Sequence, residues 1–346
     1  MKVFLCVVLL FMFSPQVVSA SEYTLPTVPD SGQEYMPDDT ESFAEGLWFV
    51  ISSAIENTQP IIAESAGVCL SCVCVVLLCS IVQTLPGDTK KMISLCGTVI
   101  IGVILFRPAN NLIDLAIKTV QDMTDYGNLL LPVLTSSLAA QGGAGTSAAL
   151  YAGTALFSGI LNKLVCLLIV PVIYLYAFIC VANCALSQPL LEELKKFLKW
   201  FMTWVLKTVL YIFIGYIGIT GVVSGTVDAA AVKATKLTIS SVVPVVGGII
   251  ADASETILVS AGMVKSTAGV YGLLAIAAVL VGPFLKFGVP YLMLKITGSV
   301  CTVFGVKTPT ALIGDFSGIM GLLLGITGAV ALMLMVSIVC FMKGIG

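Results

Sequence analysis

The chain has 346 residues, of which 58% are hydrophobic and 10% charged, and its formal net charge is −2. A mean hydropathy of +1.07 is too high for a soluble domain and indicates a polytopic membrane protein. Histidine is absent, which excludes Ser-His-Asp and Cys-His nucleophile pairs and imidazole zinc sites. We therefore expect no enzyme activity, no catalytic residues, no metal site and no cofactor.

The first 20 residues have the pattern of a secretory signal peptide. Lys2 precedes an apolar run from Val3 to Phe13, Pro15 interrupts it, and small residues follow from Val18 to Ala20. The alternative is an uncleaved anchor helix, although this apolar run is short for a membrane span. Either way, the next segment is expected outside the cytoplasm.

Residues 21–64 carry nine acidic residues and neither Lys nor Arg. No positive charge holds such a segment in the cytoplasm, so we interpret it as a flexible acidic extracytoplasmic leader. Within it, the stretch from Phe43 to Glu56 is expected to be an interfacial helix that Trp48 anchors.

Six stretches are long or apolar enough to cross a membrane: about 65–85, 92–107, 163–186, 200–222, 269–297 and 318–342. If the leader is outside, the loops after the first, third and fifth span are cytoplasmic. All three bear lysines, as the positive-inside rule requires: Lys90 and Lys91, then Lys195, Lys196 and Lys199, then Lys295 and Lys307. The C-terminus then lies outside.

Two apolar regions, 128–162 and 241–266, do not fit as simple spans. Each begins with a proline between aliphatic residues, and Pro132 and Pro244 are 112 positions apart. A second proline follows each at the same interval, Pro171 and Pro283. We infer an internal duplication of about 112 residues. The chain then divides into two spans at 65–107, membrane repeat 1 at 108–222 and membrane repeat 2 at 223–346.

Each of these two regions combines a proline with paired glycines: Pro132, Gly142 and Gly143 in the first, and Pro244, Gly247 and Gly248 in the second. Such residues interrupt helices, and broken helices at matching positions of two repeats indicate a pathway or binding site. The alternative is two kinked spans packed among the others. The repeats are parallel if the regions are re-entrant and inverted if each crosses once. The expected fold is an all-α polytopic membrane protein with about six transmembrane helices plus two re-entrant or broken-helix hairpins.

The second hairpin contains the acids Asp252 and Glu255, which share one face of a helix. They are candidates for a pathway or ion site, together with Gln141 and Thr146 of the first repeat. The alternative is a helix-end ion pair at the water boundary, with a cation such as Lys265.

The remaining motifs indicate packing. Three glycine pairs four residues apart favour close helix packing or a homo-oligomer: Gly221 and Gly225, Gly314 and Gly318, Gly321 and Gly325. Cysteines 69, 72, 74 and 79 in the first span are interpreted as small packing residues rather than a redox or metal site. Asp315 is expected to cap the last helix.

The stretch 110–126 is amphipathic and predicts an interfacial helix or a partner-docking face. Asp114, Lys118, Gln121, Asp122 and Asp125 fall on its polar face, and Ile113, Ala116, Ile117, Val120 and Met123 on the other. The chain has one arginine and neither a Walker loop nor a dinucleotide fingerprint, so nucleic-acid binding and nucleotide hydrolysis are not expected.

Several of these segments resemble one known family. The "GDTKK" loop, "LLPVLTSSLAAQGG", the stretch from Asp228 to Gly262 around "VPVVGGIIADASET", and "FGVKTPTALIGDFSG" are similar to the stage III sporulation protein AE family of endospore-forming bacteria. The resemblance implies a mother-cell protein of the outer forespore membrane. It also implies partners: other stage III sporulation proteins of a channel-like complex and a forespore membrane protein. Membrane lipid is a further expected partner.

Overall fold

The computed structural model describes residues 26–37, 42–84, 90–140, 144–186, 188–219 and 267–345. These residues are helical, with short turns and no strand among them. Six helical segments are long and apolar enough to cross a membrane, and they correspond to the six expected spans with more residues each: Gln59–Gln83, Lys91–Ser136, Ala148–Leu186, Pro189–Ile217, Ala268–Phe304 and Lys307–Met342. The expectation of an all-α fold with six such helices is confirmed.

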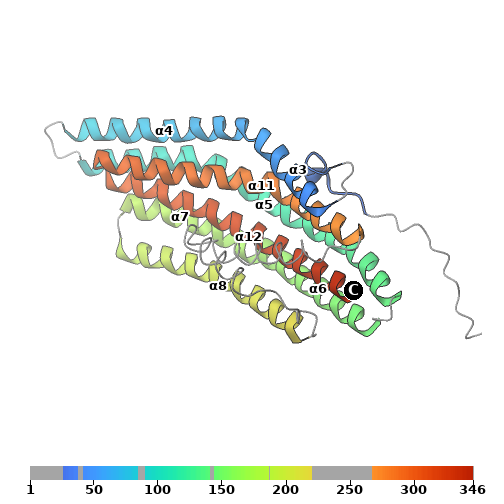
Figure 1. Cartoon of the computed structure of the whole chain (residues 1–346). Helices are drawn as coiled ribbons and strands as arrows, with labels where there is room; N and C mark the ends of the chain where they lie inside the picture. The colour runs from blue at the N-terminus through green and yellow to red at the C-terminus, as the bar shows by residue number, and fades with distance from the viewer. Residues whose placement is uncertain are drawn as a thin grey trace, which may run out of the picture.

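The long helices lie side by side in an elongated bundle, and the six spans alternate in direction (Figure 1). In chain order the elements are α2 (Asp30–Gln33), α3 (Phe43–Glu56), α4 (Gln59–Gln83), α5 (Lys90–Ala140), α6 (Ala144–Leu164), a π turn (Val165–Ile169), α7 (Val170–Leu186), α8 (Pro189–Ile219), α11 (Thr267–Cys301), a 3₁₀ turn (Thr302–Phe304) and α12 (Lys307–Ile345). Helices α6 and α7 form one continuous span.

The helix ends that flank the three lysine-bearing connections lie together at one end of the bundle, which we call the lysine end (Figure 1). The Ser80 hydroxyl of α4 donates to the Phe304 carbonyl at 3.0 Å, and the hydroxyls of Ser94 and Thr308 are in contact. Helix α3 and the C-terminus lie at the opposite end. The expected common side of the three lysine loops is therefore found in the structure.

Helix α12 occupies the centre of the bundle. It packs against α5, α6, α7, α8 and α11, and 89% of its most apolar window is buried, against 28–61% for the other five spans. Phe316 and Phe341 are fully buried near its two ends. At its start, Gly305 has a φ of 75°, a left-handed conformation that suits glycine and ends the preceding 3₁₀ turn.

The described part of the acidic leader is packed onto the bundle. Helices α2 and α3 contact α11, and Phe43, Val50 and Ala54 of α3 are buried. The Ser31 hydroxyl donates to the Asp122 carboxylate of α5 at 2.8 Å. Trp48 is 71% exposed, as an interfacial anchor would be.

Helix α5 differs from expectation because it continues through both of its prolines, Pro108 and Pro132, and ends at Ala140. The helix break expected at Pro132 is therefore absent there. Residues 110–126 form the middle of this helix and not a separate interfacial one. Neighbouring helices tolerate a proline inside a membrane helix because they cover the freed backbone groups. The two expected faces are confirmed: Asp114, Lys118, Gln121 and Asp125 are exposed, and Ile113, Ala116, Val120 and Met123 are buried.

The ends of α5 and α6 pack against each other at the far end of the bundle, so most of region 128–162 extends two long helices. Region 241–266 lies outside the described residues. Helices α6 and α7 run in the same direction as α11, and α8 runs in the same direction as α12 (Figure 1). These helix directions are the ones expected for parallel repeats. The duplication itself stays a prediction.

Exposed charged side chains on five helices fall in a band at comparable distances along their helices from the lysine end, which we call the charged level: Glu64, Arg107, Lys163, Lys207 and Lys286. At 1.5 Å per residue they lie about 22 to 35 Å along their helices from the lysine end. That distance matches a hydrocarbon core of about 30 Å, and the side chains exposed between this charged level and the lysine end are mainly apolar. With 51 residues, α5 is about 75 Å long and extends far beyond this level.

We predict that the hydrocarbon layer ends at the charged level and that the rest of α5 projects on the extracytoplasmic side. In a variant with Cys74 and Cys96 changed to Ser, we expect a membrane-impermeant maleimide to label Lys118→Cys in intact cells that express the protein in the cell membrane outside sporulation. The matched variant Val103→Cys, whose native side chain is 70% exposed on the apolar side of the level, should stay unlabelled. Equal labelling of the two, or labelling of Val103→Cys alone, would contradict this placement.

Candidate functional site

Most residues expected at a pathway lie outside the described part of the chain. These are Gln141, Gly142 and Gly143 in one gap and Pro244, Gly247, Gly248, Asp252 and Glu255 in the other. The packing pair Gly221 and Gly225 also lies in the second gap. Thr146 lies in the first turn of α6. The structure therefore does not test the expected ion site, which stays a prediction.

The four α12 glycines that were expected to favour helix packing differ in their surroundings. A Cβ at Gly321 would lie 3.2 Å from the Tyr291 ring, so its absence lets α11 and α12 approach closely. Gly325 faces a small gap beside α8. Gly314 and Gly318 line a larger cavity near the lysine end.

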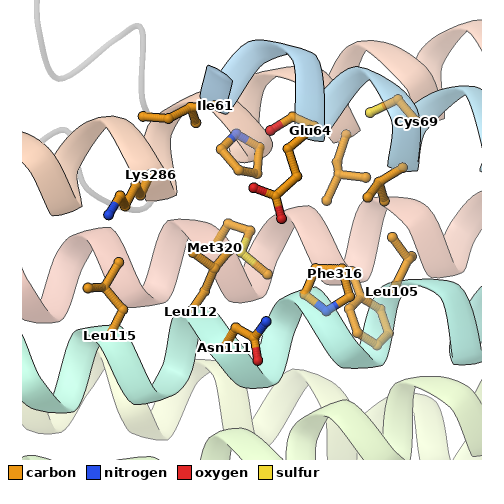
Figure 2. A pocket seen from close by; sticks show the side chains of 15 residues that line it. Ile61, Glu64, Cys69, Leu105, Asn111, Leu112, Leu115, Lys286, Phe316 and Met320 are labelled. Carbon is orange, nitrogen blue, oxygen red and sulfur yellow. The ribbon is translucent and has the colours of Figure 1, made fainter. Parts of the chain in front are cut away.

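Sequence reasoning missed a cavity of about 360 Å³ between α4, α5, α11 and α12, which we call the central pocket. It lies at the charged level described above. Its lining is mainly apolar, and its polar side chains include Glu64, Asn111 and Lys286. Figure 2 shows the Glu64 carboxylate pointing from α4 into the pocket, with Asn111 below it on α5.

Two helix-interior prolines line this pocket from two different helices, Pro108 of α5 and Pro290 of α11. Each lacks the N–H that would bond to the carbonyl four residues earlier, which belongs to Ile104 and Lys286 respectively. Prolines on two neighbouring helices therefore release carbonyl oxygens close to the pocket.

The central pocket can hold a small polar or charged group, because a carboxylate, an amide and an ammonium line it and freed carbonyls lie close to it. The ion pairs found in the described part of the chain all involve Lys195 or Lys196, so Glu64 is not paired with Lys286 there. The sequence did contain a signal for the pocket, because Lys286 and Pro290 lie inside an expected span.

Nearer the lysine end, Lys195 bridges two acids of different helices. Its ammonium lies 3.0 Å from Glu192 of its own helix and 3.2 Å from Asp315 of α12. The side chains of Lys195 and Asp315 are only 14% and 16% exposed. Asp315 was expected to cap a helix, but it lies inside α12, because the turn at Gly305 starts that helix earlier. It ties α8 to the central helix instead.

We predict that Asp315→Asn lowers the free energy of unfolding by on the order of 3 kcal/mol, because it leaves the half-buried Lys195 charge with only Glu192. The double variant Lys195→Met and Asp315→Leu should recover most of this loss, since no charge is left unpaired. Denaturation in detergent followed by circular dichroism measures both. A double variant as unstable as Asp315→Asn would contradict the assignment.

The comparisons with known proteins point to one family. A family model described as stage III sporulation protein AE matches residues 44–344. The chain is 26% identical over 219 residues to the protein of that name from Bacillus subtilis (strain 168), and the match covers 61% of this chain and 54% of that protein. The chain thus spans about half the length of this curated relative. No solved structure matches.

Proposed function

The chain belongs to the stage III sporulation protein AE family, and from this membership we propose that it is a multipass membrane component of a channel-like, secretion-related complex. That complex would join mother cell and forespore and support forespore development. The protein would lie in the outer forespore membrane, with other stage III sporulation proteins and a forespore membrane protein as partners. We propose no enzymatic activity for it.

The observation that carries this proposal is the packing of α12. Because the central helix is almost wholly buried by its neighbours, the described bundle is filled by a helix along its axis. Such a bundle suits a membrane core on which other proteins assemble, and a conduit would run between chains of the assembly. The α12 glycine that lets α11 approach, Gly321, supports this dense packing.

The central pocket favours a second candidate, a secondary transporter. Interior prolines on two helices beside a carboxylate and an ammonium resemble the broken-helix sites at which transporters hold ions and substrates. This function would use the pocket together with the two acids expected in the second hairpin, Asp252 and Glu255. The two candidate functions differ in what they predict when single charged side chains are neutralised: a scaffold tolerates the change, and a transporter loses its function.

Under the scaffold proposal, neutralising the hairpin acids is tolerated. We predict that a deletion strain complemented with Asp252→Asn plus Glu255→Gln sporulates at close to the wild-type frequency, with normal protein accumulation on an immunoblot. Heat-resistant spore counts measure this. Loss of sporulation with normal accumulation and normal partner recruitment would favour the transporter.

The central pocket gives an independent comparison. We predict that Glu64→Gln plus Lys286→Gln also leaves spore counts near wild type, because both changes keep the side-chain size and the pocket shape. The control is Arg107→Gln, a charge at the same level that does not line the pocket. A failure of the pocket variant alone, at normal protein level, would assign transport to the pocket.

A further inference from the structure

A second cavity, of about 750 Å³, lies at the lysine end between α8, α11 and α12. Three lysines line it: Lys199 of α8, Lys295 of α11 and Lys307 at the start of α12. We call it the lysine pocket. Its lining contains neither Asp nor Glu, so three like charges face one space without an acidic partner in its wall.

Nearby acids do not neutralise this pocket. Asp315 is close enough to Lys199 for an electrostatic interaction, but its carboxylate is already bonded to Lys195. Glu192 and Glu193 pair with Lys195 and Lys196. An anion in the pocket would relieve the mutual repulsion of its lysines.

The serine and threonine hydroxyls of the pocket wall already donate to backbone carbonyls. Ser317 donates to the Tyr291 carbonyl at 3.0 Å, and Thr310 to the Val306 carbonyl at 2.7 Å. Thr302 donates to the Ser299 carbonyl at 2.6 Å. Because these hydrogens are already used, a ligand here meets ammonium donors and must itself supply acceptor oxygens.

Glycines keep this space open. A Cβ at Gly298 would lie 3.8 Å from the backbone nitrogen of Gly314, and one at Gly318 would lie 3.6 Å from the Lys199 ammonium nitrogen. Larger residues at these positions would occupy the volume between α11, α12 and Lys199. The hollow is therefore a consequence of three small residues in the two tightly packed helices.

The surroundings indicate where the ligand comes from. On α8, Trp200 and Trp204 stack at 6.0 Å between ring centroids and are 57% and 51% exposed. On α11, Leu292 and Ile296 are 57% and 63% exposed. These side chains offer apolar surface to an acyl chain. The pocket thus combines a position at the lysine end with lipid-facing apolar surface on two of its helices.

We propose that the lysine pocket binds a phosphate-bearing anion, supplied as the headgroup of an acidic phospholipid. Basic pockets between transmembrane helices bind such headgroups, and each Lys near the surface contributes about 1 kcal/mol. The site does not depend on the role of the protein in a channel complex. It would fix α8 to the α11 and α12 pair through the lipid.

The test uses the full chain purified in a neutral detergent, with thermal unfolding followed as phosphatidylglycerol or phosphatidylcholine is added in mixed micelles. A third series adds inorganic phosphate alone. The variants are Lys199→Gln plus Lys295→Gln and, as a matched control, Lys196→Gln, a lysine of the same helix and the same bundle end that pairs with Glu193 outside the pocket.

We expect phosphatidylglycerol to raise the unfolding temperature of the wild type and of Lys196→Gln, with apparent affinity roughly 30-fold weaker in the double variant. Phosphatidylcholine should have little effect. Equal affinity of the double variant and the wild type would overturn the site. A shift with inorganic phosphate equal to that with phosphatidylglycerol, and lost in the double variant, would overturn the lipid as the source and assign a free phosphate ion.

Discussion

The burial of α12 among the other long helices is the contact on which the rest of the structure depends. A membrane gives no hydrophobic drive for helices to associate, so close packing and interhelical polar contacts must hold them together. Here α12 supplies both: Gly321 admits the Tyr291 ring, Ser317 bonds to the Tyr291 carbonyl, and Asp315 pairs with Lys195. The bundle is therefore organised around one helix, and the outer helices face it on one side and lipid on the other.

The two ends of this bundle have different chemistry. Lysines and the lysine pocket gather where the connections after α4, α7 and α11 lie, whereas the packed leader and the acids of α5 lie toward the other end. The central pocket falls between them, at the level where charged side chains reappear on several helices. A protein with distinct faces on the two sides of a membrane fits a part of an assembly that joins two compartments.

Hydropathy and the lysine pattern sufficed to predict the six long helices and the shared end of their connections, because burial in lipid imposes long apolar runs and positive charges bias the loops. The helix break predicted at Pro132 was wrong. Neighbouring helices accommodate this proline inside α5, and a single sequence does not show which helices are neighbours. Asp315 was likewise placed at a helix start because its partner, Lys195, is 120 positions away. The central and lysine pockets draw on three or four helices each, and such proximity has no signature along one chain.

The π turn at Val165–Ile169 affects the angular phase of the helix that contains it. A π turn accommodates one extra residue, which corresponds to about 100° of rotation. In α6, the Thr154 hydroxyl bonds to Ser337 of α12. In α7, the buried Tyr176 lies next to Gly318, which also belongs to α12. The extra residue therefore sets which faces of α6 and α7 are turned toward α12. Removing a single residue from the turn would rotate one half against the other, so the length of this segment, more than its side chains, is under constraint.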